Sequence, residues 1–139
     1  MSGDQVAVVL DATALAAYVN GQVAVGELIA EVADEGRQVA VPATCLAAAH
    51  AATTGDVGTA LLTLLATTPA VTLVPLGADP SVDDARQTGV LARAAGGDIA
   101  LGHAARTALA HQAHLATADP TAAAVVLPTG WSILDLSQM

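Results

Sequence analysis

Residues 5–11 read QVAVVLD, a continuous β-favouring run that is apolar from Val6 to Leu10 and ends at an aspartate. A short run without polar alternation is typical of a strand buried on both faces of a parallel sheet. Residues 12–20 follow at helical spacing, and a second run of the same kind, QVAVPA, occupies residues 38–43. This succession of strand, helix and strand predicts the βαβ unit of an α/β fold.

The same alternation continues through the rest of the chain. Five strands joined by right-handed crossovers predict a three-layer α/β/α sandwich with a central parallel sheet of about five strands. Residues 1–139 are expected to form one domain. We expect strands at 5–10, 38–43, 71–76, 114–118 and 131–136, and helices at 12–20, 23–36, 44–53, 56–68, 82–97, 98–111 and after Pro120.

The composition indicates an aliphatic core and no membrane segment. Hydrophobic residues make up 54% of the chain, but aromatic residues only 1%, so Ala, Val, Leu and Ile must form the core. No apolar run reaches the roughly 18 residues of a membrane-spanning helix, and the basic start of a signal peptide is missing. Cys45, the lone cysteine, is expected to be a buried and inert thiol. These features predict a cytoplasmic protein with no membrane partner.

The charge balance argues against a broad nucleic-acid surface. Four arginines and no lysine stand against thirteen acidic residues, which gives a net charge of −9. Phosphate backbones are bound mainly by clustered basic residues, so RNA is disfavoured as a partner. Arg86 and Arg93 share one face of the helix expected at 82–97. We expect a solvated face there and not a phosphate-binding patch.

Two aspartates follow strands at positions where ligands bind in open parallel sheets. Asp11 ends the first strand and Asp119 follows the fourth, so both carboxylates enter one cleft if these strands are neighbours. Mg²⁺ and Mn²⁺ prefer such oxygen ligands, and water bound to the ion can attack a phosphodiester. The alternative is structural, because Asp11, Asp98 and Asp119 all precede helical segments, where Asp is a favoured N-cap.

Three segments that occur in order resemble the PIN-domain family: VVLDATAL, VAVPATCLAAAH and ALAHQAHLATADP. The similarity covers nearly the whole chain. It implies the α/β/α fold already expected, and the family's VapC-type toxins imply a Mg²⁺-dependent endoribonuclease that is a homodimer and is neutralised by an antitoxin protein. Asp11 and Asp119 match the family's first and last acids. Thr13 and Thr117 match the hydroxyl residues that accompany them.

Two of the four acids that the resemblance implies have no direct counterpart. The family's glutamate falls at Ala48, and its third acid falls at 119 − 18 = 101, which is Leu101. Asp98 lies three residues earlier (101 − 98 = 3) on the same helix face and is a candidate replacement, although the competing role of N-cap is favoured. His50 is close to Ala48 in sequence but is expected to point away from the cleft.

The sequence therefore predicts an incomplete acidic site. We expect weak binding of Mg²⁺ or Mn²⁺ and weak or lost RNase activity, because removing charged ligands lowers affinity for a hard cation. A catalytically inactive PIN-fold binding or regulatory module is the alternative, and an unrelated α/β binding domain with capped helices is a third possibility. The candidate catalytic and metal-binding residues are Asp11, Asp98 and Asp119, supported by Thr13 and Thr117.

Three histidines lie close together in the sequence. His111 and His114 have the spacing of a zinc-binding pair, with His103 nearby. However, the helix is expected to end between His111 and His114, and no third ligand follows at zinc-site spacing. We therefore expect surface or helix-end histidines.

Overall fold

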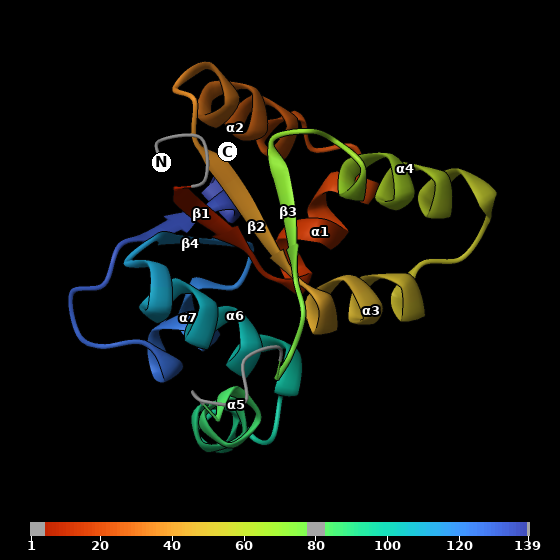
Figure 1. Ribbon diagram of the computed structural model, residues 1–139. Helices are drawn as coiled ribbons and strands as arrows, with labels where there is room; N and C mark the ends of the chain where they lie inside the picture. The colour runs from red at the N-terminus through yellow and green to blue at the C-terminus, as the bar shows by residue number, and fades with distance from the viewer. Residues whose placement is uncertain (1–4, 78–82, 139) are drawn as a thin grey trace.

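The computed structural model describes residues 5–77 and 83–138, and its α/β architecture confirms the predicted fold class. All four neighbouring strand pairs are parallel, as expected for strands that are apolar throughout. The strands are β1 (Val6–Leu10), β2 (Gln38–Pro42), β3 (Val71–Val74), β4 (His114–Thr117) and β5 (Ile133–Asp135), and their order in the sheet is β3-β2-β1-β4-β5 (Figure 1).

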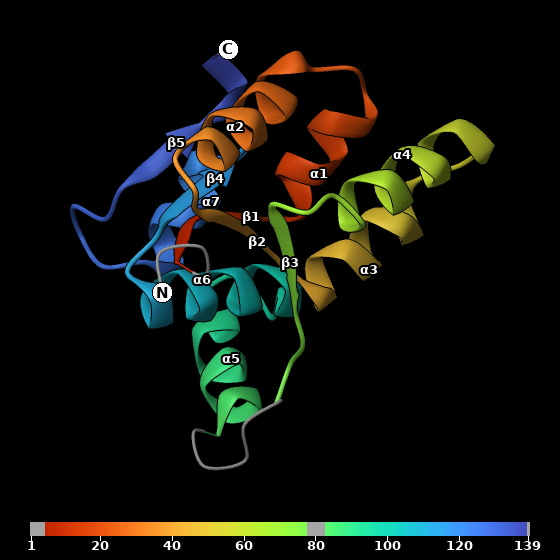
Figure 2. The same ribbon diagram turned by 45° about the horizontal axis from the view of Figure 1, so that its top comes forward.

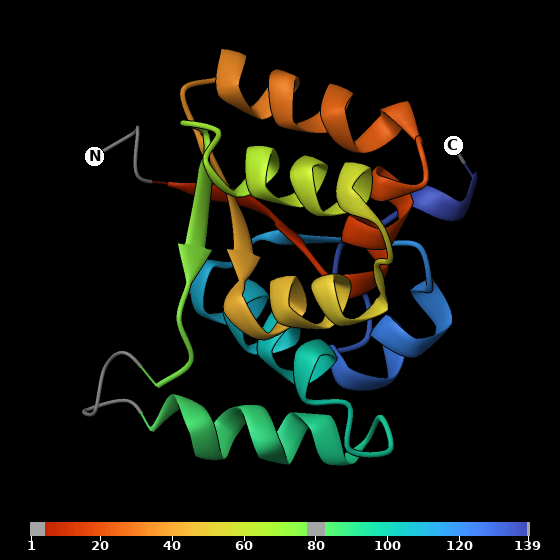
Figure 3. The same ribbon diagram turned by 90° about the vertical axis from the view of Figure 1, so that its right-hand side faces the viewer.

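Helices cover both faces of the sheet (Figures 2 and 3). The helices α1, α2 and α4 lie on one face, α6 and α7 lie on the other, and α5 packs on the outside of α6. Their bounds are α1 (Ala12–Val19), α2 (Val23–Asp34), α3 (Ala43–Ala52), α4 (Asp56–Ala66), α5 (Asp84–Arg93), α6 (Ile99–His111) and α7 (Pro120–Val126). A 3₁₀ helix, η2 (Leu136–Gln138), follows β5. No helix within the described ranges has both the length and the apolarity needed to span a bilayer.

The central strands are buried on both faces, which explains their unbroken apolar sequence. Val9, Val41 and Leu115 are fully buried, and β1 is buried along its whole length. The edge strands are shorter than expected. The strand predicted at 71–76 stops at Val74, because the next residue, Pro75, has no N–H to donate to a neighbouring strand.

The helix predicted at 82–97 is also shorter than expected. In the described part of the chain it runs over Asp84–Arg93, and its predicted first residue, 82, lies outside the described residues. Gly96 and Gly97 then adopt φ angles of +68° and +89°, which glycine accommodates without steric cost. The turn they form lies between the end of α5 and the start of α6.

The strand order reverses between β1 and β4. β2 and β3 lie on one side of β1, whereas β4 and β5 lie on the other side. In open α/β sheets such a reversal leaves a crevice at the carboxyl ends of the two central strands. The residues that directly follow β1 and β4 therefore lie at this crevice.

Candidate functional site

A small cavity lies at the carboxyl ends of β1 and β4. Its volume is about 50 Å³, and it brings together the three aspartates that the sequence singled out, as well as Leu101. Ala48 and His50 on α3 are not among its described lining residues. The complete described lining is Asp11, Ala12, Thr13, Asp98, Leu101, Asp119 and Ala122.

Asp11 is the buried acid of this cavity. Only 3% of the residue is exposed, and its Oδ1 accepts hydrogen bonds from Thr13 Oγ1 at 2.7 Å and from the Ala14 amide at 2.9 Å. Burial raises the pKa of Asp11, while hydrogen bonds from Thr117 and Thr13 oppose that rise. A cation bound beside this carboxyl group would favour its ionised form.

The two threonines join the ends of β1 and β4. Thr13 Oγ1 lies 3.0 Å from Thr117 Oγ1 and also accepts a hydrogen bond from the backbone amide of Ala118 at 2.9 Å. Thr117 Oγ1 in turn accepts the amide of Asp119 at 3.0 Å. This network fixes the orientation of Asp11 and the backbone that leads to Asp119, so both threonines have a positioning role.

All three aspartates are also helix N-caps. Asp98 Oδ1 accepts the amide of Leu101 at 3.1 Å, and Asp119 Oδ1 accepts the amide of Ala122 at 3.2 Å. Asp11 caps α1 in the same way, through Ala14. The capping and cavity-lining interpretations therefore both hold. Each cap uses Oδ1, and a carboxylate has a second oxygen with which to contact a ligand.

The cavity has the right ligand chemistry for a hard cation but too few converging ligands. In residues 5–77 and 83–138, no group of three or more His, Cys, Asp or Glu side chains is arranged to hold a metal ion. Leu101, which is 7% exposed, forms part of the wall. A volume of about 50 Å³ holds one or two waters, whereas Mg²⁺ retains several waters in most protein sites.

Replacing Asp11 with asparagine is expected to stabilise the protein at pH 7. The folded state raises the pKa of Asp11, so this residue's contribution to stability is fully present below the unfolded pKa of 3.8 and is lost as pH rises through the folded pKa. Asparagine keeps the cap acceptor but carries no charge. We expect a gain of about 1 kcal/mol in the free energy of urea unfolding at pH 7.

The gain should disappear at pH values below 3.8, where Asp11 is protonated in both states. The matched control is Asp119→Asn, a change at an exposed cap of the same type, which should alter stability little at either pH. A pH-independent effect of Asp11→Asn, or a loss of stability at pH 7, would contradict the assignment of Asp11 as a buried, unneutralised acid.

The expectation of a surface histidine is wrong for His103. This residue is 3% exposed, and its Nδ1 lies 2.7 Å from Thr44 Oγ1 on α3. Burial lowers the pKa of His103, while Asp84 and the carbonyl of Pro75 oppose the change. His103 thus ties α6 to α3 and to the segment after β3. Its burial was detectable in principle, because α6 carries small or apolar residues around most of its circumference, which is typical of a buried helix.

The other sequence expectations for reactive side chains agree with the structure. His111 ends α6 and His114 begins β4, and both are exposed. Cys45 is fully buried, donates to the carbonyl of Ala100, and has its pKa raised mainly by burial. Arg86 and Arg93 are exposed, as expected for a solvated face, and Arg86 pairs with its neighbour Asp83 at 3.1 Å.

The sequence matches no model of a known protein family and no curated protein.

Proposed function

We propose that this chain is a PIN-like protein related to VapC-type, Mg²⁺-dependent endoribonucleases, with an incomplete acidic site and weak or lost RNase activity. The proposal rests on the position of Asp11, Asp98 and Asp119, which all line one cavity at the carboxyl ends of β1 and β4. Asp11 and Asp119 follow neighbouring strands, and Asp98 at the start of α6 adds a third carboxyl group where the strand order reverses. The ordered sequence motifs supply the second line of support.

In this proposal each side chain of the cavity has a defined task. Asp11 and Asp119 would hold Mg²⁺ or Mn²⁺, and Asp98 would contact the ion or one of its waters. Thr13 would keep Asp11 oriented, through the 2.7 Å hydrogen bond, and Thr117 would hold the backbone at Asp119. When bound, the ion supplies an activated water and neutralises charge on a phosphodiester.

Three features support a weak site. Leu101 occupies the position of one expected acid, and Ala48 occupies another. The raised pKa of Asp11 means that protons compete with a metal ion for this carboxyl group. The missing charges at positions 48 and 101 and the competition from protons both reduce affinity for a divalent cation, because ligand charge largely sets that affinity.

The electrostatics disfavour tight RNA binding for the same chain. Three of the four arginines form ion pairs, so their charge is already partly neutralised. These pairs are Arg37–Glu35 at 3.7 Å, Arg86–Asp83 at 3.1 Å and Arg106–Asp84 at 3.3 Å. This favours, as the second candidate, a catalytically inactive PIN-fold module that binds or regulates another molecule. A homodimer and an antitoxin partner belong to the proposal through the family resemblance alone.

RNA cleavage in the presence of Mg²⁺ or Mn²⁺ tests the enzymatic part. We expect slow cleavage or none by the wild-type chain, with any cleavage abolished by EDTA and by Asp11→Asn. Asp34→Asn, which alters an exposed carboxylate outside the cavity, should leave it unchanged. Cleavage that survives Asp11→Asn would contradict the proposed site. Metal binding at the cavity without any cleavage would favour the inactive module.

A further inference from the structure

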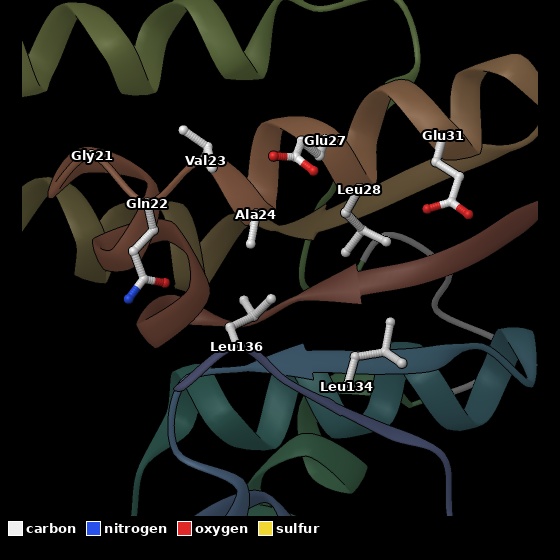
Figure 4. Close-up of a pocket in the computed structure, with 9 residues that line it drawn as sticks. All are labelled: Gly21, Gln22, Val23, Ala24, Glu27, Leu28, Glu31, Leu134 and Leu136. Atoms are coloured by element: carbon white, nitrogen blue, oxygen red, sulfur yellow. The ribbon is translucent and has the colours of Figure 1, made fainter. Parts of the chain in front are cut away.

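An apolar groove separates α2 from the C-terminal segment of the chain. Its volume is about 650 Å³, and it shares no lining residue with the carboxylate cavity. Ala24 and Leu28 on α2 face Leu134 and Leu136 across the groove (Figure 4). Val23 completes the apolar lining at the start of α2. We call this feature the α2–β5 groove.

Part of this apolar surface is open to solvent. Val23 is 72% exposed, and Leu28 and Leu134 are half-buried. β5 is the last strand of the sheet, so in the described part of the chain no strand pairs with its outer edge. An apolar groove with a polar rim can receive the apolar side chains of another molecule.

The rim of the groove is acidic. Glu27 and Glu31 are exposed on α2, four residues apart, and neither takes part in an ion pair of the described residues. Like charges at this spacing destabilise a helix by a few tenths of a kcal/mol. No Lys or Arg is among the described lining residues. A basic group on an occupant of the groove would therefore complement the charge of this rim.

This charge pattern discriminates between occupants. A second copy of the chain, docked groove to groove, would bring its own Glu27 and Glu31 against the first pair, and like charges across an interface are unfavourable. A segment with aliphatic residues on one side and Lys or Arg beside them complements both the apolar lining and the acidic rim of the groove. Because α2 has 12 residues, which is about 18 Å of helix, a helical segment of about three turns matches the length of the wall.

We propose that the α2–β5 groove binds a cationic amphipathic helix of a partner protein. The aliphatic side of that helix packs on Leu28 and Leu134, and its basic residues pair with Glu27 and Glu31. This is the helix-in-groove mode of peptide recognition. The inference is independent of the carboxylate cavity and holds whether or not the chain cleaves RNA.

The probe is a fluorescent 16-residue peptide with Leu at i, i+3, i+4 and i+7 and Lys on the flanks, titrated with the full chain near physiological salt. Anisotropy should give a dissociation constant of roughly 10 µM. Glu27→Gln with Glu31→Gln should weaken binding about tenfold, which corresponds to about 1.4 kcal/mol. The control pair Asp34→Asn with Asp56→Asn changes net charge equally at exposed sites outside the groove and should have less than about a twofold effect.

Apolar contact is tested separately. Val23→Ser should weaken binding several-fold, whereas Val57→Ser, at a position on α4 that is 76% exposed, should not. A scrambled peptide with the same composition should not bind. Equal effects of the two charge pairs, or equal binding of the scrambled peptide, would overturn the proposal by showing diffuse charge attraction. A dimer in sedimentation that Val23→Ser dissociates would also overturn it, because the occupant would then be a second copy.

Discussion

Replacing Leu101 with aspartate and Ala48 with glutamate should tighten Mn²⁺ binding at least about tenfold over the wild-type chain. Leu101 already lines the cavity with Asp11, Asp98 and Asp119, so a carboxylate at this position adds a fourth charged group to the same lining. Ala48 lies on α3. Glutamate is chosen there because the resemblance to PIN domains puts a glutamate at this position, and its side chain is longer than that of aspartate. Calorimetric titration of Mn²⁺ measures the change.

The same double variant should be less stable than wild type without metal. Leu101 is 7% exposed, so Leu101→Asp puts a charge into a nearly dry site beside the buried Asp11. We expect a loss of about 2–4 kcal/mol in EDTA. Mn²⁺ at about 100 times its dissociation constant should restore about 2.7 kcal/mol of that loss, because a ligand that binds only the folded state stabilises it.

Leu101→Asn with Ala48→Gln is the matched control for this variant. It has almost the same shape and loses the same apolar contacts, but adds no charge. It should be destabilised in EDTA and should gain nothing from Mn²⁺. Rescue of both variants, or of neither, would show that the cavity is not a degraded cation site.

Gly102→Ala is expected to lower the free energy of unfolding by about 2–3 kcal/mol. Gly102 lies on α6 where α5 crosses it, and a Cβ atom there would lie 2.5 Å from the carbonyl oxygen of Thr88 and 2.9 Å from Ala92 Cβ. Both contacts are far below van der Waals distance, and one is with helix backbone that does not move aside easily. The midpoint temperature of thermal unfolding should fall by roughly 5–10 °C.

Gly89→Ala is the control that separates packing from helix propensity. Gly89 lies on α5, and a Cβ atom there would meet nothing within 4 Å. Alanine is the better helix former, so this change should raise stability by about 0.5–1 kcal/mol. Equal effects of Gly102→Ala and Gly89→Ala would contradict the close packing of α5 on α6. Both variants are measured by urea and thermal unfolding.

The sequence predicted the sheet well because its central strands carry an unambiguous signal. Val6–Leu10 and Gln38–Pro42 are apolar throughout, and strands of this kind have to be buried on both faces. The sequence did not predict the order of the strands, and it placed Asp11 and Asp119 together only on the condition that their strands are neighbours. The pairing of β1 with β4 joins residues more than 100 positions apart, and it is this pairing that brings Asp11 and Asp119 to one edge.

Other features could not be predicted because they depend on tertiary packing. The hydrogen-bond contact of His103 with Thr44 joins α6 to α3, and local sequence does not specify which helices meet. The α2–β5 groove combines Leu28 with Leu134 and Leu136, from opposite ends of the chain. Asp98 is intermediate: the sequence allowed both a cap and a cavity position, and the structure has both.

We propose that Asp11 belongs to a cation site with an incomplete set of charged ligands. Calorimetric titration of Mn²⁺ into the wild-type chain and into Asp11→Asn distinguishes such a site from a simple helix cap. We predict wild-type binding with a dissociation constant of about 1 mM, and no binding by Asp11→Asn even though that variant is folded and more stable at pH 7. Binding that is unchanged in Asp11→Asn, or absent from both proteins at Mn²⁺ concentrations up to roughly 20 mM, would contradict the account.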